Sequence, residues 1–200
     1  KVREASVGLF VDGEYRLTEH LRAYAGLRYD RFRYDVAGND CETVIIGCLN
    51  AGRAEAGTSS SKASLIYTLS KNAELYLSYG EGFHSNDARG TTILVDPLSG
   101  MPVDAVTPLV DTFGYELGAR WYLSDKLNAT LALWQLKLDS ELLFVGDAGE
   151  TEPSRASKRY GIEWNNHYKL IDWLLVDADL AVSRARFTQF DPVGQRIPGS

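Results

Sequence analysis

The chain has 200 residues, of which 44% are hydrophobic and 24% are charged, and its formal net charge is −6. This composition is typical of an ordered chain, and the negative charge argues against a nucleic-acid partner. No run of 18 apolar residues is present, which excludes a transmembrane helix. The aromatic content, with Tyr 11, Phe 7 and Trp 4 against Met 1, favours strands over helices.

Residues 3–36 alternate between apolar and polar side chains with a period of two, which predicts a β-hairpin. Its strands are joined by a short polar turn near Thr18. One face is small and apolar, whereas the other carries Arg22, Arg28 and Asp30. These charges could not line a dry core without a penalty of roughly several kcal/mol for each unpaired charge. We therefore expect the charged face to be wet.

Residues 37–61 are rich in Gly, Ala and Ser and are predicted to form a long loop. This segment holds both cysteines, Cys41 and Cys48, and their spacing favours a local disulfide in an oxidising compartment. A zinc site is the competing interpretation, but no nearby His or second Cys pair would complete a tetrahedral ligand set. Two unpaired thiols are the third interpretation. We predict no metal site.

The second hairpin is predicted over residues 62–83, with a tight turn at residues 70–72. Its second strand alternates strictly from Ala73 onwards and then enters a long loop, residues 84–111, that Gly and Pro residues punctuate. The two faces of this strand carry Leu75, Leu77 and Tyr79 on one side and Glu74, Tyr76 and Ser78 on the other.

Four polar residues lie where this strand enters the loop: His84, Asn86, Asp87 and Arg89. They are our candidate ligand contacts, either to a small molecule or to a metal chelate. The alternative interpretation is structural: Asp87 pairs with Arg89, and Ser85 or Asn86 bonds to the backbone. Because such bonds are common in turns, we favour the structural interpretation.

Two further hairpins are predicted over residues 112–145 and 156–187, and loops over residues 146–155 and 188–200. The strand around Trp134 is ambiguous in phase, because apolar residues occupy both parities. Either a β-bulge lies near Trp134 or part of the polar face is apolar. The two parities are Leu131 and Leu133 against Trp134, Leu136 and Leu138.

The connections alternate between short and long along the whole chain. Tight turns fall near residues 18, 71, 125 and 172, and the long loops fall between them. An up-and-down barrel in an outer membrane has this asymmetry, with tight turns at the periplasmic rim and long loops outside, whereas a Greek-key sandwich does not require it. Aromatic residues near the short turns fit an interfacial girdle. They are Trp121, Trp164, Tyr168 and Trp173.

We therefore predict an all-β fold in which about eight antiparallel strands form part of a transmembrane β-barrel. Residues 1–200 would be one partial barrel domain. Charged residues on the polar face would solvate the lumen and brace neighbouring strands through cross-strand pairs. The predicted lumen-facing residues are Arg28, Asp30, Glu74, Tyr76, Glu116, Arg120, Arg159 and Glu163.

Five stretches support a family-level comparison: residues 26–30, 79–90, 114–120, 140–149 and 157–163. In their order and spacing they resemble the barrel of TonB-dependent outer-membrane receptors. The longest is Tyr-Gly-Glu-Gly-Phe-His-Ser-Asn-Asp-Ala-Arg-Gly, which starts at Tyr79. The resemblance covers most of the chain and implies the central part of a barrel of about 22 strands.

The resemblance also implies a function. Members of this family are energised importers in the outer membrane of Gram-negative bacteria, in which a TonB protein pulls on an N-terminal plug to admit ferric siderophores, cobalamin, sugars or other scarce solutes. The implied partners are outer-membrane lipid, the TonB complex through a plug that this chain lacks, and a small-molecule ligand that could be a ferric chelate. No resident cofactor is implied, and some lumen-facing charges would hold the plug.

Two other functions are compatible with the pattern of strands. One is a complete small barrel of about eight strands with a structural or adhesive role, and the other is a soluble lipocalin-like binding module. An enzyme is not expected, because the sequence has no His-Glu-x-x-His, Gly-x-Ser-x-Gly, Walker or dinucleotide-binding motif. We predict no catalytic residue.

Overall fold

The computed structural model describes residues 1–38, 48–97, 99–140, 142–145, 150–189 and 194–197. Most of them lie in long strands. The strands are β1 (Val2–Arg16), β2 (Leu21–Val36), β3 (Gly52–Ser70), β4 (Ala73–Ser85), β5 (Leu109–Ser124), β6 (Leu127–Leu138), β7 (Leu142–Val145), β8 (Glu150–Pro153), β9 (Ser157–Ile171) and β10 (Leu174–Phe187). A single helical turn, α2 (Ala88–Thr91), follows β4.

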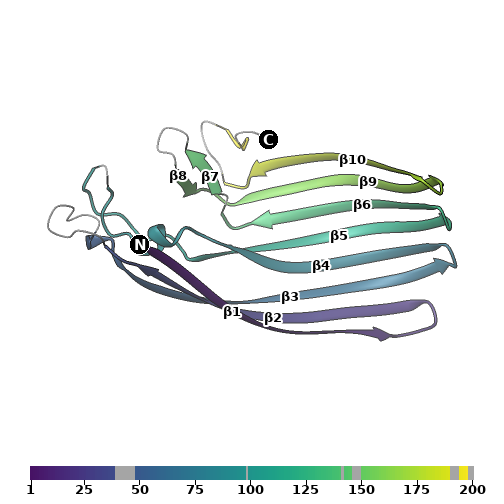
Figure 1. Ribbon diagram of the computed structural model, residues 1–200, viewed down its shortest axis with the longest axis horizontal. Helices are drawn as coiled ribbons and strands as arrows, with labels where there is room; N and C mark the ends of the chain where they lie inside the picture. Colours follow the sequence, from purple (N-terminus) through teal and green to yellow (C-terminus); the bar gives the residue numbers. More distant parts are fainter. Residues whose placement is uncertain (39–47, 98, 141, 146–149, 190–193, 198–200) are drawn as a thin grey trace.

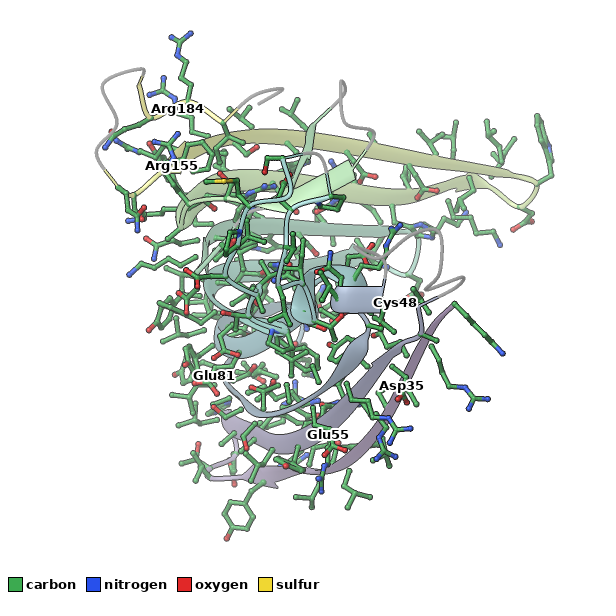
Figure 2. The ribbon with its side chains drawn as sticks, turned by 90° about the vertical axis from the view of Figure 1, so that its left-hand side faces the viewer. Asp35, Cys48, Glu55, Glu81, Arg155 and Arg184 are labelled. Atoms are coloured by element: carbon green, nitrogen blue, oxygen red, sulfur yellow. The ribbon has the colours of Figure 1, made fainter. Side chains whose placement is uncertain are left out.

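Eight of the strands form one antiparallel sheet in the order β1-β2-β3-β4-β5-β6-β9-β10, and β7 pairs with β8 in a separate sheet. The tight turns all lie at one end of the large sheet, while the long connections and the β7–β8 hairpin lie at the other (Figure 1). The sheet is strongly curved (Figure 2). The predicted up-and-down order and the four predicted tight turns are confirmed.

Two faces of the sheet differ in chemistry because successive strand residues point to opposite sides. The pairing register aligns these alternating sets from strand to strand. One row of the apolar face consists of Leu77, Leu117, Leu133, Ile162 and Val182. The row one position away belongs to the polar face and consists of Ser78, Glu116, Trp134, Gly161 and Ser183.

Large side chains of the apolar face are exposed, which a soluble sheet would avoid. Leu9 is 75% exposed, Leu117 52% and Leu180 67%. By contrast, Asp30 and Tyr76 on the polar face are nearly fully buried. A half-exposed antiparallel sheet in water has the opposite arrangement, and an apolar surface of this extent marks contact with another apolar medium.

Aromatic residues mark both edges of the apolar face. Tyr29, Tyr79, Tyr115 and Tyr160 lie toward the long connections, whereas Tyr15, Tyr67, Trp121 and Tyr168 lie toward the tight turns. Between these edges the outward side chains are almost all apolar, and with its aromatic ends this band spans seven residues of β5 (115–121) and nine of β9 (160–168). A tilted strand crosses the hydrocarbon core of a bilayer in about 9–11 residues. The rings of Trp121 and Trp164, both predicted girdle residues, lie 6.2 Å apart.

The start of β3 corrects one sequence-based boundary. Residues 52–61 were predicted to belong to a loop, but β3 begins at Gly52 and pairs with the full length of β2. Pairing with a neighbouring strand overrides the low β-propensity of Gly, Ala and Ser. The small residues also suit their partners, since Ala54 and Ala56 lie opposite Tyr34 and Phe32.

The region after β6 corrects two more boundaries. β6 ends at Leu138, so the predicted hairpin over residues 112–145 extends too far, and residues 150–153 of the predicted loop form β8. No register shift occurs at Trp134 in either pairing of β6, so there is no bulge there. Trp134 therefore lies on the polar face, part of which is apolar. Gly161 on β9 lies opposite Trp134 and leaves room for its ring, because a Cβ at Gly161 would lie 2.9 Å from Trp134 Cζ2.

The predicted loop over residues 84–111 is partly regular. Its first two residues extend β4, its last three belong to β5, and α2 lies between them. None of the helices in the described part of the chain has the length and apolar character needed to cross a membrane.

Candidate functional site

The pairing register places all eight predicted lumen-facing residues on the polar face. Those on β2, β4 and β5 join local networks. Arg159 and Glu163 lie on β9, opposite Leu136 and Ala132. The polar face is the candidate functional surface because it collects ionisable side chains that a hydrated ligand or a second domain could contact.

One arginine links strands across the polar face. Arg22 on β2 donates a hydrogen bond of 2.7 Å to Glu74 on β4 and one of 3.4 Å to Glu14 on β1. Its guanidinium therefore reaches past β3 to a carboxylate 52 residues away in the sequence. Glu74 is directly paired with Arg120 on β5. Alternating charges from β1, β2, β4 and β5 therefore brace the wall.

Asp30 is the most buried charged residue on the polar face, at 2% exposure. Arg28 donates two hydrogen bonds of 2.6 Å to its two carboxylate oxygens. Gly8 on β1 leaves room for this pair, since a Cβ there would lie 2.3 Å from Asp30 Oδ1. A buried carboxylate requires such a partner, and a bidentate arginine is the strongest one available.

Tyr76, Glu116 and Arg120 form a second cluster in the middle of the polar face. The Tyr76 hydroxyl donates to Glu116 Oε1 at 2.5 Å, and the Arg120 guanidinium lies 4.5 Å from the centre of the Tyr76 ring. The ring lies over Gly118, where a Cβ would come within 2.3 Å of it. Sequence reasoning found these three polar residues but missed the role of Gly118, which becomes visible only from the register.

The polar side chains of β9 and β10 form pairs that sequence reasoning did not predict. His167 Nδ1 lies 2.7 Å from Asp177 Oδ1, and Asn165 donates to Asp179 at 3.0 Å. All four belong to the polar face near the tight turns. Their alternating pattern was visible in the sequence, but only the pairing of β9 with β10 shows which of them meet.

The segment between β4 and β5 folds over the polar face at the end of the long connections. β4 pairs with β3 only as far as Gly80, and beyond that point it pairs with β5 alone. The Phe83 ring meets the Phe32 ring of β2 edge-on at 5.5 Å. The fully buried Tyr34 donates from its hydroxyl to Pro108 O at 3.3 Å. The segment between β4 and β5 therefore covers part of the polar face.

Of the four candidate ligand contacts, Asp87 and Arg89 form the capping network of the structural interpretation. Asp87 Oδ1 accepts from the Arg89 backbone N–H at 2.8 Å, and its Oδ2 accepts from the Arg89 guanidinium at 2.7 Å. The side-chain hydrogen bond from Arg89 holds the pKa of Asp87 below its ordinary value. Asp87 therefore remains ionised and hydrogen-bonded to Arg89 at neutral pH.

Asn86 and His84 are held in the same segment. Asn86 is 3% exposed and donates from Nδ2 to Thr107 O at 2.6 Å, while its Oδ1 has no hydrogen-bond partner among the described residues. His84 lies in β4 opposite Val110. Asn86 is therefore buried and His84 half-buried, whereas Asp87 and Arg89 are exposed.

The cysteine prediction falls partly outside the described residues. Cys48 is disulfide-bonded, but Cys41 lies outside them, so the pairing of the two remains a prediction. No group of three or more His, Cys, Asp or Glu side chains in the described ranges is placed to hold a metal ion.

The family model described as "TonB dependent receptor-like, beta-barrel" matches residues 1–200. The chain belongs to this family. No curated protein sequence matches the chain. Similar solved structures include the ferric yersiniabactin uptake receptor FyuA from Yersinia pestis, with 14% identity and a TM-score of 0.64. Another is the alcaligin outer-membrane receptor FauA from Bordetella pertussis, with 21% identity and a TM-score of 0.65. A third is the copper transporter OprC, with 18% identity and a TM-score of 0.68.

The matches cover nearly all of this chain but only part of each receptor. The match to FyuA covers 94% of this chain and 28% of that receptor. The match to FauA covers 98% and 32%, and the match to OprC covers 93% and 30%, in the same order. At these identities the likeness shows the fold. The predicted fold class is confirmed: the chain forms eight antiparallel up-and-down strands of a TonB-dependent receptor barrel.

Proposed function

We propose that this chain is part of the wall of an outer-membrane receptor that takes up a scarce solute, such as a ferric siderophore, in a TonB-dependent step. The family match over the whole chain carries this proposal. Among the similar structures, one is named a ferric yersiniabactin uptake receptor, one a siderophore receptor and one a copper transporter, so a metal chelate is the class of solute that the neighbours favour.

In this proposal the two faces have different environments. The exposed leucines and valines of the apolar face contact lipid in the outer membrane of a Gram-negative bacterium, and the aromatic residues at both edges lie at its interfaces. The polar face lines the lumen. Its networks around Arg22, Asp30 and Tyr76 brace the wall and present charge to a plug domain, through which TonB acts.

The segment carrying His84, Asn86, Asp87 and Arg89 lies at the mouth of the barrel in this proposal. Its internal hydrogen bonds support a shaping role first and ligand contact second. The exposed Asp87–Arg89 pair is the part that a solute entering from outside could reach.

A complete eight-stranded barrel fits the structure less well. Closing such a barrel requires β1 to pair with β10, but within the described residues β1 pairs only with β2 and β10 only with β9. A lipocalin-like module would enclose its apolar face, which is exposed here. Both observations favour a segment of a larger barrel.

Uptake measurements on the intact receptor test this proposal. Cells lacking the receptor gene should lose uptake of one radiolabelled ferric chelate from a panel, and inactivating TonB in otherwise wild-type cells should abolish the same uptake. Returning the gene should restore uptake only where TonB is active. Uptake that continues without TonB, or a deletion strain that takes up every solute tested at the wild-type rate, would contradict the proposal.

A further inference from the structure

Basic residues line up across four neighbouring segments at the outer edge of the apolar face. Lys137 on β6 is directly paired with Lys158 on β9, and Lys158 with Arg186 on β10. The backbone of Arg186 in turn forms an isolated antiparallel β-bridge with Arg196, in the segment beyond β10. Directly opposed residues of antiparallel strands share a face, so four cations form one row, which we call the cationic row.

The described part of the chain supplies no carboxylate partner to the cationic row. Two of the four contact aromatic residues: Arg186 donates to the Tyr160 hydroxyl at 2.9 Å, and Lys137 Nζ lies 5.1 Å from the centre of the Phe113 ring. Like charges directly opposite each other destabilise a sheet, so this row requires an outside anion.

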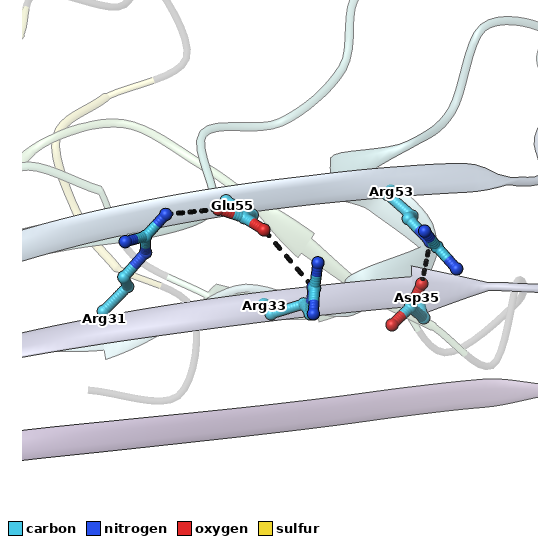
Figure 3. A network of polar contacts seen from close by, with 5 residues as sticks. All are labelled: Arg31, Arg33, Asp35, Arg53 and Glu55. Atoms are coloured by element: carbon cyan, nitrogen blue, oxygen red, sulfur yellow. Dashed lines mark hydrogen bonds and ion pairs between the residues drawn. The ribbon is translucent and has the colours of Figure 1, made fainter.

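The same edge of the sheet is built differently on β2 and β3. There Glu55 accepts from Arg31 at 2.7 Å and lies 3.3 Å from Arg33, and Asp35 pairs with Arg53 at 2.5 Å (Figure 3). Both groups lie just beyond the tyrosines of the apolar face. The described part of the chain therefore neutralises basic residues at one part of this edge and leaves them unneutralised at another, although the net charge of the whole chain is −6.

The surface beside the cationic row is apolar and hollowed. A shallow hollow of about 550 Å³ is lined by Leu77, Leu117 and Leu133 on its apolar side, and Lys158, Tyr160 and Arg186 border it. Arg184 on β10 is directly paired with Tyr160, one row nearer to these leucines than Arg186, and is exposed. The leucines of the hollow and the basic residues at its border are complementary to a lipid whose acyl chains lie on the leucines and whose head group carries phosphate.

We propose that the cationic row is a binding site for the phosphate groups of an anionic membrane lipid, whose acyl chains lie in the leucine-lined hollow. This inference rests on the proposed function in one respect, that the apolar face contacts lipid. Arg and Lys donate charge-assisted hydrogen bonds to phosphate oxygens. The bound lipid would replace the carboxylates that β3 supplies to the arginines of β2.

Lipid titrations of the purified full-length receptor in detergent, followed by native mass spectrometry, test this site. The probes are lipid A with two phosphates, zwitterionic phosphatidylethanolamine, and inorganic phosphate. Lipid A should bind at least tenfold more tightly than phosphatidylethanolamine. The double variant Lys158→Gln/Arg186→Gln should lose about 25-fold in affinity for lipid A, because each basic residue at an anionic surface contributes roughly fivefold.

The matched control is Arg31→Gln/Arg53→Gln, which removes the same charge from the same edge where carboxylates already neutralise it. Its affinity for lipid A should remain within about twofold of wild type, and added salt should weaken the wild type more than Lys158→Gln/Arg186→Gln. Equal losses in both double variants would overturn the proposal. Displacement of lipid A by millimolar inorganic phosphate would also overturn it, since the site would then bind free anions.

The outcomes also separate this inference from the proposed function. A receptor that binds both lipids equally well still contacts membrane lipid, and only the cationic row as a phosphate site is then wrong. A receptor that associates with neither lipid contradicts the membrane location itself.

Discussion

Replacing Leu117 with Arg should destabilise the intact receptor by about 2–4 kcal/mol in a bilayer, the penalty for a cation near the middle of the lipid face of a β-barrel. Leu117 is 52% exposed and lies in a row of aliphatic side chains between Leu77 and Leu133. No acidic partner is available on this face between the aromatic edges, so the charge would remain in hydrocarbon or draw water into it.

The matched control for this change is Ser78→Arg on the adjacent row. Ser78 is paired with Glu116 on the polar face, so an arginine there gains a carboxylate neighbour and water. Its expected effect is below about 1 kcal/mol, the usual range for exposed ion pairs. Denaturant titration of the full-length variants in phospholipid vesicles measures both effects. Equal destabilisation by the two variants would show that the faces are not chemically distinct.

Replacing Gly118 with Ala should destabilise the barrel by about 1–3 kcal/mol, the range for overpacking a well-filled site. The added Cβ would lie 2.3 Å from Tyr76 Cζ, so the ring must move. Any such movement lengthens the hydrogen bond from Tyr76 to Glu116 and removes the ring from beneath the Arg120 guanidinium. The effect is large for one methyl group because the hydrogen bond and the cation–π contact both depend on the position of the Tyr76 ring.

Gly80→Ala provides the control, since nothing lies within 4 Å of a Cβ at that strand position of the same face. That change should be neutral or slightly stabilising, because alanine restricts the unfolded chain more than glycine does. In a Tyr76→Ala background, Gly118→Ala should lose most of its effect, which a double-mutant cycle of unfolding midpoints would show. Additive effects of the two substitutions would contradict the assigned clash.

The strands and their faces could be predicted because a period of two needs no knowledge of partners. Leu75, Leu77 and Tyr79 alternate with Glu74 and Tyr76 in the sequence as they do in β4. The hydrogen bonds between strands could not be predicted in the same way. The contact of Arg22 with Glu74, for example, depends on the registers of β2, β3 and β4 together.

Residues with a weak local signal were the ones predicted wrongly. The Gly, Ala and Ser residues at the start of β3 have low β-propensity, and pairing with β2 decides their conformation. Near Trp134 both parities are apolar, so periodicity could not assign a face. The cationic row was missed because its members come from β6, β9, β10 and the segment beyond.

The candidate site at the start of the long connection was predicted in part. Polar residues next to a turn suggested either ligand contact or a capping network, and the structure forms the hydrogen bonds of the network at Asp87 and Asn86. Ligand contact by His84, Asn86, Asp87 and Arg89 stays a prediction.

The central claim is that alternate residues of this wall face lipid and water. Single spin-labelled cysteines at positions 115–121 of β5, in the full-length receptor with Cys41→Ser and Cys48→Ser in native outer membranes, test it most directly. We expect collision rates with oxygen to peak at positions 115, 117, 119 and 121, and those with a water-soluble nickel chelate to peak at 116, 118 and 120. Equal access of the nickel chelate to both sets would contradict the account.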